Sequence, residues 1–349
     1  MRVSDFDFAL PDELIAQRPA EVRDASRLLT LDRSSGAIAD GAFTDISSAL
    51  RPGDLLVVND TRVFPARLIG RREPSGGRVE LFPVADRGSG VWDVLARPAA
   101  RLRPGDTVVA GEGPDALRAV VESVEASGRR IVRFDEPSSL WERLDRWGRT
   151  PLPPYIHRVE SSDDARLDAE RYQTVFARAR GAIAAPTAGL HFTNELLRRL
   201  EDAGVARASV TLHVGYGTFQ PVRVERVEDH RVEPESYEIP AETVEAVART
   251  RAAGGRVVAV GTTTTRALES AAEPSGALRV GPGTADVFIY PGYTFRAIDA
   301  LVTNFHLPKS SLLMLVAAFA GRERVLEAYR HAVENRYRFY SYGDAMLIV

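Results

Sequence analysis

The sequence contains 349 residues, of which 44% are hydrophobic and 27% charged, and its formal net charge is −3. The length suits two domains with a sizeable core. The lack of cysteine excludes disulfides, thiolate nucleophiles and cysteine-ligated zinc or iron–sulfur clusters, and the charge excludes the global basic field of many nucleic-acid binders.

The apolar runs and the N-terminus argue against a membrane protein. The longest wholly apolar run, 312–320, is far shorter than the roughly 20 residues of a membrane span. The first fifteen residues, MRVSDFDFALPDELI, carry acids where a signal peptide would carry bases and an apolar stretch. We therefore expect a soluble, cytoplasmic protein without a membrane partner.

The segment 62–150 reads as short strands separated by turns. The turn signals are EPSGG, DRGSG, RPGD, GEGPD and ASG. This spacing is typical of a small antiparallel barrel or sandwich. A short helix over 138–147 and the proline-rich PLPPY then mark the exit from this domain. The predicted strands are 62–69, 78–84, 91–96, 106–109, 117–124 and 130–134.

The rest of the chain alternates strands and helices. Thr193 can cap a helix that Gly204 ends, and Pro240 can open another that Gly254 and Gly255 end. Further helices begin at Ser311 and run through 325–333. The predicted strands are 54–58, 181–185, 208–214, 256–260, 287–290, 300–302 and 346–349. The sequence predicts an α/β domain, 1–61 and 151–349, interrupted by a smaller antiparallel β-barrel domain, 62–150.

Five polar segments are candidates for a functional site rather than for a purely structural role. In an open α/β domain ligands collect where strands end and helices begin, and four of the five are such junctions in this interpretation. The segments are VVNDTRVFPAR (57–67), APTAGLHF (185–192), TLHVGYGTF (211–219), VGTTTTRALES (260–270) and VTNFHLPKSS (302–311).

Each segment also has a purely structural alternative. A single histidine near a strand end is more often hydrogen-bonded packing than a catalyst. The run Thr262–Thr265 could only cap a helix, although a glycine followed by hydroxyls at a helix start also holds anions well. Gly215 and Gly217 could serve only a turn.

Several standard signatures are missing. The sequence has no GxxxxGK[ST], HExxH, GxSxG or GxGxxG motif, and its six histidines lack metal-ligand spacing. The residues alone therefore indicate a two-domain protein without a metal site, with a polar site at strand ends, and they do not name a reaction.

At these same segments the chain resembles the S-adenosylmethionine:tRNA ribosyltransferase-isomerase family of queuosine biosynthesis. The resemblance runs nearly end to end. It includes DFDFALPDELIAQRP, GDLLVVNDTRVFPARL, GAIAAPTAGLHF, VTLHVGYGTFQPVRVE, VVAVGTTTTRALE, DALVTNFHLPKSSLLMLVAAFAG and YRFYSYGDAMLI. Two departures stand out. Many members have MHSE where this chain has VEPE with Glu233, and many have GTTSVR where this chain has GTTTTR.

The resemblance implies an activity and its partners. The substrate would be a tRNA with a GUN-type anticodon whose wobble base is 7-aminomethyl-7-deazaguanine. Its amine would receive the ribosyl carbons of S-adenosylmethionine, giving epoxyqueuosine-tRNA while adenine and methionine leave. The family also implies an inserted β-barrel, a monomer, and no metal or other cofactor, because S-adenosylmethionine is a consumed substrate.

Chemistry narrows the candidate residues on the matched segments. The sulfonium acidifies the 5′-carbon, so the reaction needs a base there and an acid or hydrogen-bond donor for the departing adenine. The catalytic candidates are His306, His213 and His191, followed by Asp229 with His230.

Binding roles follow from charge and shape. Arg266 and the turn Gly261–Thr263 could hold the methionine carboxylate, and an aromatic ring (Phe192, Phe219 or Phe305) could face the sulfonium. The full set of predicted substrate-binding residues is Thr187, Gly189, Gly215, Gly217, Thr218, Phe219, Gly261, Thr262, Thr263, Arg266, Asn304 and Phe305.

The predicted tRNA contacts are Arg62, Arg67, Arg71 and Arg72. The alternative is a solvated charged face, which is the usual meaning of such a run. Two other functions remain open. A tRNA methyltransferase would transfer one methyl group and release S-adenosylhomocysteine, and an RNA-binding module would consume no S-adenosylmethionine.

Overall fold

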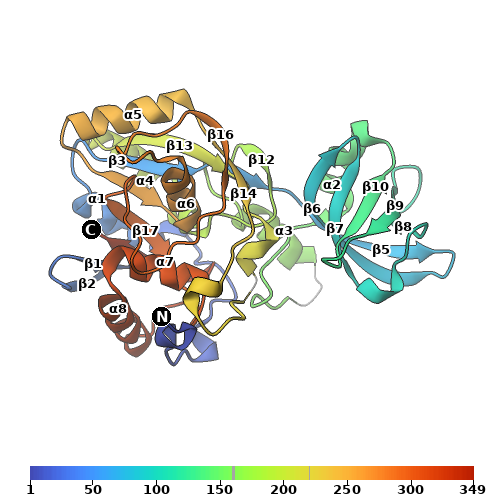
Figure 1. Ribbon diagram of the computed structural model, residues 1–349, viewed down its shortest axis with the longest axis horizontal. Helices are drawn as coiled ribbons and strands as arrows, with labels where there is room; N and C mark the ends of the chain where they lie inside the picture. Colours follow the sequence, from blue (N-terminus) through green and yellow to red (C-terminus); the bar gives the residue numbers. More distant parts are fainter. Residues whose placement is uncertain (159–161, 220) are drawn as a thin grey trace. The chain divides into compact units, whose positions relative to one another are not determined.

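The chain forms two compact units in this computed structural model, which describes residues 1–158, 162–219 and 221–349 (Figure 1). The side chains of residues 162, 218 and 219 also lie outside the described part. The first unit, here called the main unit, comprises Met1–Arg62, Pro154–His157 and Gln173–Val349. The second, the barrel unit, comprises Val63–Pro153 and Arg158–Tyr172. The segment 158–172, which the sequence interpretation placed in the α/β domain, thus groups with the barrel.

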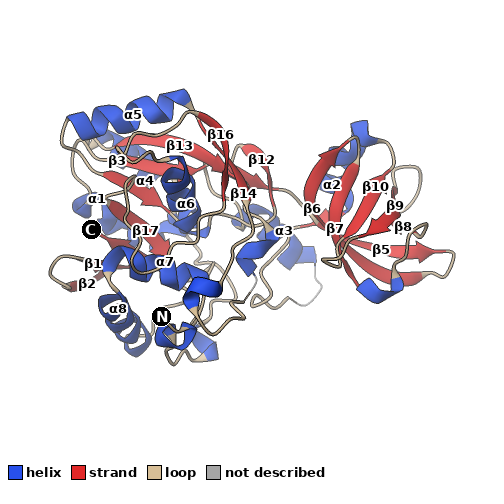
Figure 2. Ribbon diagram, viewed as in Figure 1, coloured by secondary structure: helices blue, strands red, loops and turns tan. Residues whose placement is uncertain are grey.

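A nine-stranded mixed sheet forms the centre of the main unit (Figure 2). Its four middle strands, β13, β3, β15 and β17, run parallel, so their carboxyl ends meet at one edge. The strand order is β16-β14-β13-β3-β15-β17-β18-β1-β2. In that order the strands span Gly281–Ala285, Glu235–Ile239, Ala206–Leu212, Leu55–Asn59, Val257–Val260, Ala300–Asn304, Ala345–Ile348, Arg27–Leu31 and Ile38–Ala42.

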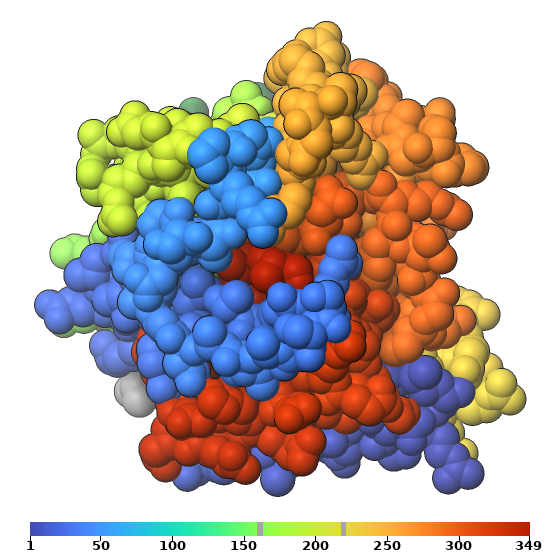
Figure 3. Space-filling view, turned by 90° about the vertical axis from the view of Figure 1, so that its left-hand side faces the viewer, coloured from blue at the N-terminus to red at the C-terminus, as the bar shows by residue number. Residues whose placement is uncertain are grey.

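The outer strands tie the two ends of the chain together. Strand β1 pairs in parallel with β18, and the Arg33 amide donates to the carbonyl of Val349. Figure 3 shows the consequence on one face of the main unit, where the blue N-terminal and red C-terminal segments lie side by side. The closing strand that the sequence predicts at 346–349 is therefore confirmed as β18.

Helices cover the sheet because alternate strand residues point to opposite faces. One hydrophobic core contains Leu56, Val58, Val258 and Val302 from the strands, together with residues of α1 and α4. Strand residues that point to the opposite face, such as Val57, are also fully buried, so both faces of the sheet are covered. The helices of the main unit are α1 (Ile46–Ala49), α4 (Asn194–Asp202), α5 (Ala241–Ala252), α6 (Thr262–Ala271), α7 (Ser311–Ala320) and α8 (Arg322–Glu334).

Short 3-10 turns complete the main unit. They are η1 (Val3–Phe6), η2 (Asp12–Leu14), η3 (Arg23–Ala25), η4 (Phe43–Asp45), η7 (Thr187–His191), η8 (Tyr216–Phe219) and η9 (Val227–Asp229). The start of α4 follows the sequence signal: the Thr193 hydroxyl accepts a hydrogen bond from the Leu196 amide and caps the helix as predicted. No helix in the described ranges has the length and apolarity that crossing a bilayer requires.

The barrel unit is a closed antiparallel barrel of six strands. The order is β5-β6-β7-β10-β9-β8, and β8 pairs back to β5. Closure removes the exposed edges that an open sheet would present. Its elements are β5 (Arg67–Glu73), β6 (Gly77–Gly88), β7 (Val91–Arg97), β8 (Thr107–Ala110), β9 (Leu117–Val124), β10 (Arg130–Phe134), β11 (Gly148–Arg149), η5 (Ala99–Arg101), η6 (Pro137–Ser139), α2 (Leu140–Trp147) and α3 (Ser162–Arg171). The predicted fold class, an α/β domain with a smaller β-barrel, is confirmed.

Some predicted elements are wrong in place or kind. The expected strand 287–290 is irregular: β16 ends at Ala285, and the carbonyls of Ala285 and Val287 accept hydrogen bonds from the Arg266 guanidinium. The expected strand 181–185 begins earlier, as β12 (Ala179–Ala182), which pairs with β4 (Thr61–Val63) in a two-stranded sheet.

Candidate active site

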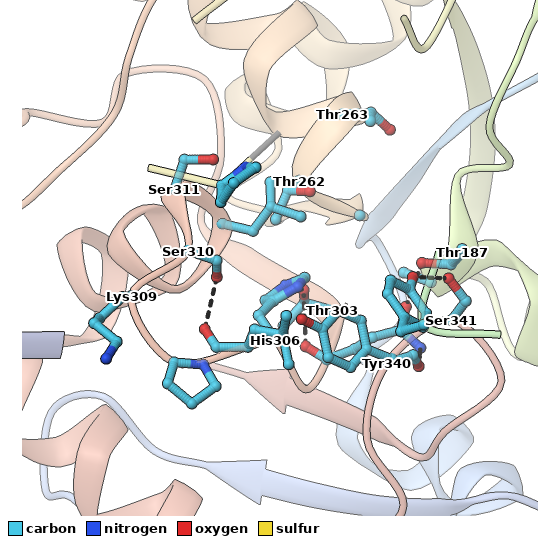
Figure 4. Close-up of a pocket in the computed structure, with 18 of the residues that line it drawn as sticks. Thr187, Thr262, Thr263, Thr303, His306, Lys309, Ser310, Ser311, Tyr340 and Ser341 are labelled. Atoms are coloured by element: carbon cyan, nitrogen blue, oxygen red, sulfur yellow. Dashed lines mark hydrogen bonds between the residues drawn. The ribbon is translucent and has the colours of Figure 1, made fainter. Parts of the chain in front are cut away.

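A pocket of about 580 Å³ lies at the carboxyl ends of β15 and β17 within the main unit (Figure 4). Gly261 to Thr263, which follow β15, form one part of its lining, and Asn304 and His306, which end and follow β17, form another. The volume falls in the range that suits a drug-sized ligand. Two segments that the sequence singled out, VGTTTTRALES and VTNFHLPKSS, therefore line one cavity.

His306 is the histidine among the residues that line this pocket. In the view of Figure 4 it lies between the start of α7, at Ser310, and Tyr340. Its Nε2 lies 2.8 Å from the Thr303 hydroxyl, and its Nδ1 has no hydrogen-bond partner among the described residues. Burial lowers the pKa of His306 to about 3, so the ring is neutral near pH 7.

His191 lies behind the pocket, and its tautomer follows from its neighbours. The Asn304 side-chain amide donates to the Tyr340 carbonyl at 3.2 Å, which fixes the amide group of Asn304 on that side. The same nitrogen lies 3.0 Å from His191 Nε2, which must therefore accept. The proton of neutral His191 is then on Nδ1 and is donated to Ser26 Oγ at 2.7 Å.

This chain of hydrogen bonds holds Asn304 in place. Thr187, which also lines the pocket, donates its hydroxyl proton to Asn304 Oδ1 at 2.9 Å. Burial lowers the pKa of His191 to about 4, so the ring stays neutral and keeps its acceptor. His191 contacts Asn304 and is not among the residues that line the pocket.

His213 belongs to a separate cluster at the end of β13. Its Nδ1 lies 2.8 Å from the Thr61 hydroxyl, and burial lowers its pKa. Its ring lies directly against Gly181, because a Cβ added at Gly181 would come within 2.7 Å of the ring. Nearby, Asn59 bonds both backbone groups of Leu212 through its side chain, so the VVNDTR segment fastens β3 to β13.

Arg266 is occupied inside the protein. Its guanidinium forms a buried ion pair with Glu235, whose other oxygen accepts from the Gly215 amide at 2.8 Å. Burial raises the pKa of Glu235, and the adjacent Arg266 opposes that rise. Arg266 lines a smaller cavity, which it shares with Gly217 and His230, and does not line the 580 Å³ pocket.

Two of the predicted binding residues, Phe305 and Gly189, have packing roles and do not line the pocket. Phe305 is fully buried among the rings of Tyr329, Tyr337 and Phe339 and does not line the pocket. Gly189 allows close packing, since a Cβ there would lie 2.7 Å from the ring of Phe176.

Other predicted residues lie outside the pocket or outside the described part. Asp229 is exposed at the end of η9, away from the pocket lining, and Phe192 is a fully buried core residue. The side chains of Thr218 and Phe219 fall outside the described residues.

The sequence interpretation missed the aromatic wall of the pocket. Tyr155 and Tyr340 line it with ring centroids 4.0 Å apart, and the Tyr155 hydroxyl lies 2.6 Å from Ser341 Oγ. Tyr340 has φ +74°, a conformation that costs energy for a residue with a side chain and tends to occur at functional sites. A tyrosine after the prolines of PLPPY was visible in the sequence, but nothing local linked it to residue 340.

The predicted tRNA-contacting arginines differ in how free they are. Arg62 is exposed, and its side chain makes no ion pair or hydrogen bond within the described residues. Arg67 pairs with Glu80 at 3.0 Å, and Arg72 donates to the Arg101 carbonyl. Arg71 is exposed, and its side chain donates to the Gly76 carbonyl. In the described parts of the chain no group of three or more acidic or histidine side chains is placed to hold a metal ion.

Comparison with known proteins identifies the family. The profile of the family described as "Queuosine biosynthesis protein" matches residues 3–348. Proteins named S-adenosylmethionine:tRNA ribosyltransferase-isomerase from Pelobacter propionicus and Trichlorobacter lovleyi are 57% and 54% identical, over the full length of both chains in each case. The crystal structure of S-adenosylmethionine tRNA ribosyltransferase from Thermotoga maritima is 40% identical, covers 99% of this chain and all of that one, and has a TM-score of 0.55. The resemblance seen in the sequence is thus confirmed, and the chain belongs to the queuosine biosynthesis family of S-adenosylmethionine:tRNA ribosyltransferase-isomerases, which are transferases.

Proposed function

We propose that this enzyme transfers and isomerises the ribosyl part of S-adenosylmethionine onto 7-aminomethyl-7-deazaguanine at the wobble position of a tRNA with a GUN-type anticodon. Epoxyqueuosine-tRNA, adenine and methionine are the products. The observation that carries this proposal is the 580 Å³ pocket at the ends of β15 and β17, which combines an aromatic wall with a histidine nitrogen that has no partner among the described residues. The family membership supports the reaction class.

His306 is the proposed base at the 5′-carbon. The sulfonium acidifies that carbon, and the neutral ring of His306 presents a nitrogen without a hydrogen-bond partner among the described residues. Its depressed pKa makes it a weak base, so the sulfonium must supply most of the activation. No metal or other cofactor enters this scheme, because the sulfonium itself activates the ribosyl group.

The tyrosine pair is the proposed partner of the sulfonium. No Asp or Glu lines the described pocket, so a cationic group finds no carboxylate there. The faces of Tyr155 and Tyr340 can attract a cation through the ring quadrupole. This role replaces the sequence-based proposal for Phe305, which is enclosed in the core.

One incubation tests the proposed reaction. The enzyme is mixed with S-adenosylmethionine and tRNA that carries the deazaguanine precursor, and the small molecules are separated by chromatography. Adenine and methionine in equal amounts, undiminished by EDTA, are the expected result. S-adenosylhomocysteine with a gain of one methyl mass on the tRNA would indicate a methyltransferase instead, and unconsumed S-adenosylmethionine would contradict any transferase activity on this tRNA.

A further inference from the structure

The four threonines at the start of α6 use their hydroxyls differently. Thr264 donates to the Val260 carbonyl at 2.6 Å, and Thr265 donates to the Gly261 carbonyl at 3.1 Å. The Thr263 hydroxyl accepts from the side chain of Asn59 at 3.3 Å. The Thr262 hydroxyl has no partner in the described part of the chain, although only 6% of the residue is exposed and it lines the pocket.

The backbone at the same helix start is also unsatisfied. No side chain caps α6, and the amides of Thr262, Thr263 and Thr264 make no hydrogen bond to any described residue. Gly261 has φ +92°, a conformation that L-residues rarely adopt, and it brings the chain into the helix without a side chain of its own. A buried helix start with free donors requires a ligand or water.

The neighbouring helix differs in this respect. The Ser310 hydroxyl caps α7 by accepting from the Leu313 amide at 3.2 Å. Lys309, the cation in the pocket lining, pairs with Asp7 at 2.9 Å. Arg266 is held by Glu235. The α6 start is therefore the part of the pocket with several unused donors, and no acidic side chain lines the described pocket to repel an anion.

We propose that the start of α6 binds the carboxylate at the amino-acid end of S-adenosylmethionine, with the Thr262 hydroxyl donating to one carboxylate oxygen and the free amides donating to the carboxylate. This inference rests on the proposed function, since it names a contact made by its substrate. In this proposal the carboxylate is bound by the start of α6, and Arg266 takes no part in the contact. A tRNA phosphate shares the required chemistry, and the test below separates the two sources with a decarboxylated analogue, because only a contact to the carboxylate distinguishes the two ligands.

Three variants and two ligands test the contact. Affinities for S-adenosylmethionine and for its decarboxylated analogue are measured by calorimetry without tRNA, for the wild type, Thr262→Val, Thr262→Ser and Thr265→Val. The Thr265 variant is the matched control, because it makes the same change on the same turn to a hydroxyl whose partner among the described residues is the Gly261 carbonyl. If S-adenosylmethionine binds only with tRNA present, KM values from adenine release replace the dissociation constants.

The expected pattern is specific to the carboxylate. Thr262→Val should bind S-adenosylmethionine about 10-fold or more weakly, since a hydrogen bond to a charged group is lost. Thr262→Ser and Thr265→Val should bind it as the wild type does, and Thr262→Val should not weaken the decarboxylated analogue. Equal weakening of both ligands, or no weakening of either, would overturn the inference while leaving the proposed function intact. A wild type that forms no adenine from S-adenosylmethionine and precursor tRNA would instead remove the proposed function, and the inference with it.

Discussion

Two buried neutral histidines should make the main unit lose stability between pH 7 and pH 5. The pKa of His191 is lowered to about 4 and that of His306 to about 3, in both cases by burial, from an ordinary value of 6.5. A histidine whose folded pKa is depressed contributes full stability above pH 6.5. That stability is lost as the pH falls, because the unfolded chain takes up protons that the folded chain cannot.

The magnitude follows from these values. At pH 5 an unfolded histidine is almost fully protonated, while His191 and His306 in the folded protein are nearly proton-free. Integrated from pH 7 to pH 5, each histidine should lower the free energy of unfolding by about 2 kcal/mol. Burial raises the pKa of Glu235 and Glu269, and this opposes the loss because the folded state then takes up protons as the pH falls.

Substitution isolates the histidine contribution, because the glutamates are common to all variants. In the His306→Gln variant, and likewise in His191→Gln, the free energy of unfolding should fall by about 2 kcal/mol less between pH 7 and pH 5 than it does in the wild type. This difference should hold whatever the variant's stability at pH 7. The readout is hydrogen exchange of amides in β17, corrected for intrinsic rates. The barrel unit serves as a control, since residues 63–153 and 158–172 contain no histidine. An unchanged decline in both variants would refute the reasoning.

Further predictions concern activity, stability and tRNA. Replacing His306 by Ala should lower adenine release about 100-fold or more while circular dichroism stays native; near-normal turnover would remove His306 from catalysis. The Arg266→Ala variant should lose about 3–5 kcal/mol in urea unfolding because Glu235 is left buried without its partner, and Glu235→Gln/Arg266→Met should recover much of that loss. For Arg62→Gln the slope of log affinity for tRNA against log salt should shrink by about 0.7–0.9, and Arg67→Gln should change it less, since Arg67 is paired with Glu80. Equal slopes in wild type and Arg62→Gln would exclude a phosphate contact there.

The sequence predicts the pocket best where it depends on strand ends. Gly261 follows β15 and Asn304 ends β17, and adjacent parallel strands place both at one edge of the sheet. Hydrophobic runs locate these strands and α7 without further information. The amino-acid pattern alone therefore assigns two segments that are far apart in the chain to one site.

The side-chain contacts between distant residues could not be predicted from the sequence in the same way. Glu235, Tyr237 and Ile239 face inward from β14, but the charged residue at an inner position hides the alternation of a strand. Only the tertiary structure brings Arg266 to that carboxylate, so the sequence left its guanidinium available for a ligand. The Tyr155–Tyr340 contact likewise joins residues far apart in the chain, and no local pattern encodes it.

The departure GTTTTR from the common GTTSVR is explained by the hydrogen bonds of α6. A serine in place of Thr264 keeps a hydroxyl for the Val260 carbonyl. A valine in place of Thr265 loses only a bond to the Gly261 carbonyl, which lies within the helix turn. Both strings keep Thr262 and Thr263, so the departure leaves the pocket-facing residues of this turn unchanged.

Tyr340 connects the aromatic wall to the polar network behind it. Its ring lines the pocket, and its carbonyl accepts from Asn304, which fixes that amide and through it the tautomer of His191. The backbone of Tyr340 has φ +74°, and the turn that follows is so tight that a Cβ added at Gly343 would lie 2.4 Å from the Arg338 carbonyl. A change at Gly343 that moved this turn would therefore displace the ring and the carbonyl together. Because one strained turn positions both, the aromatic and hydrogen-bonding parts of the pocket are coupled through the backbone of Tyr340.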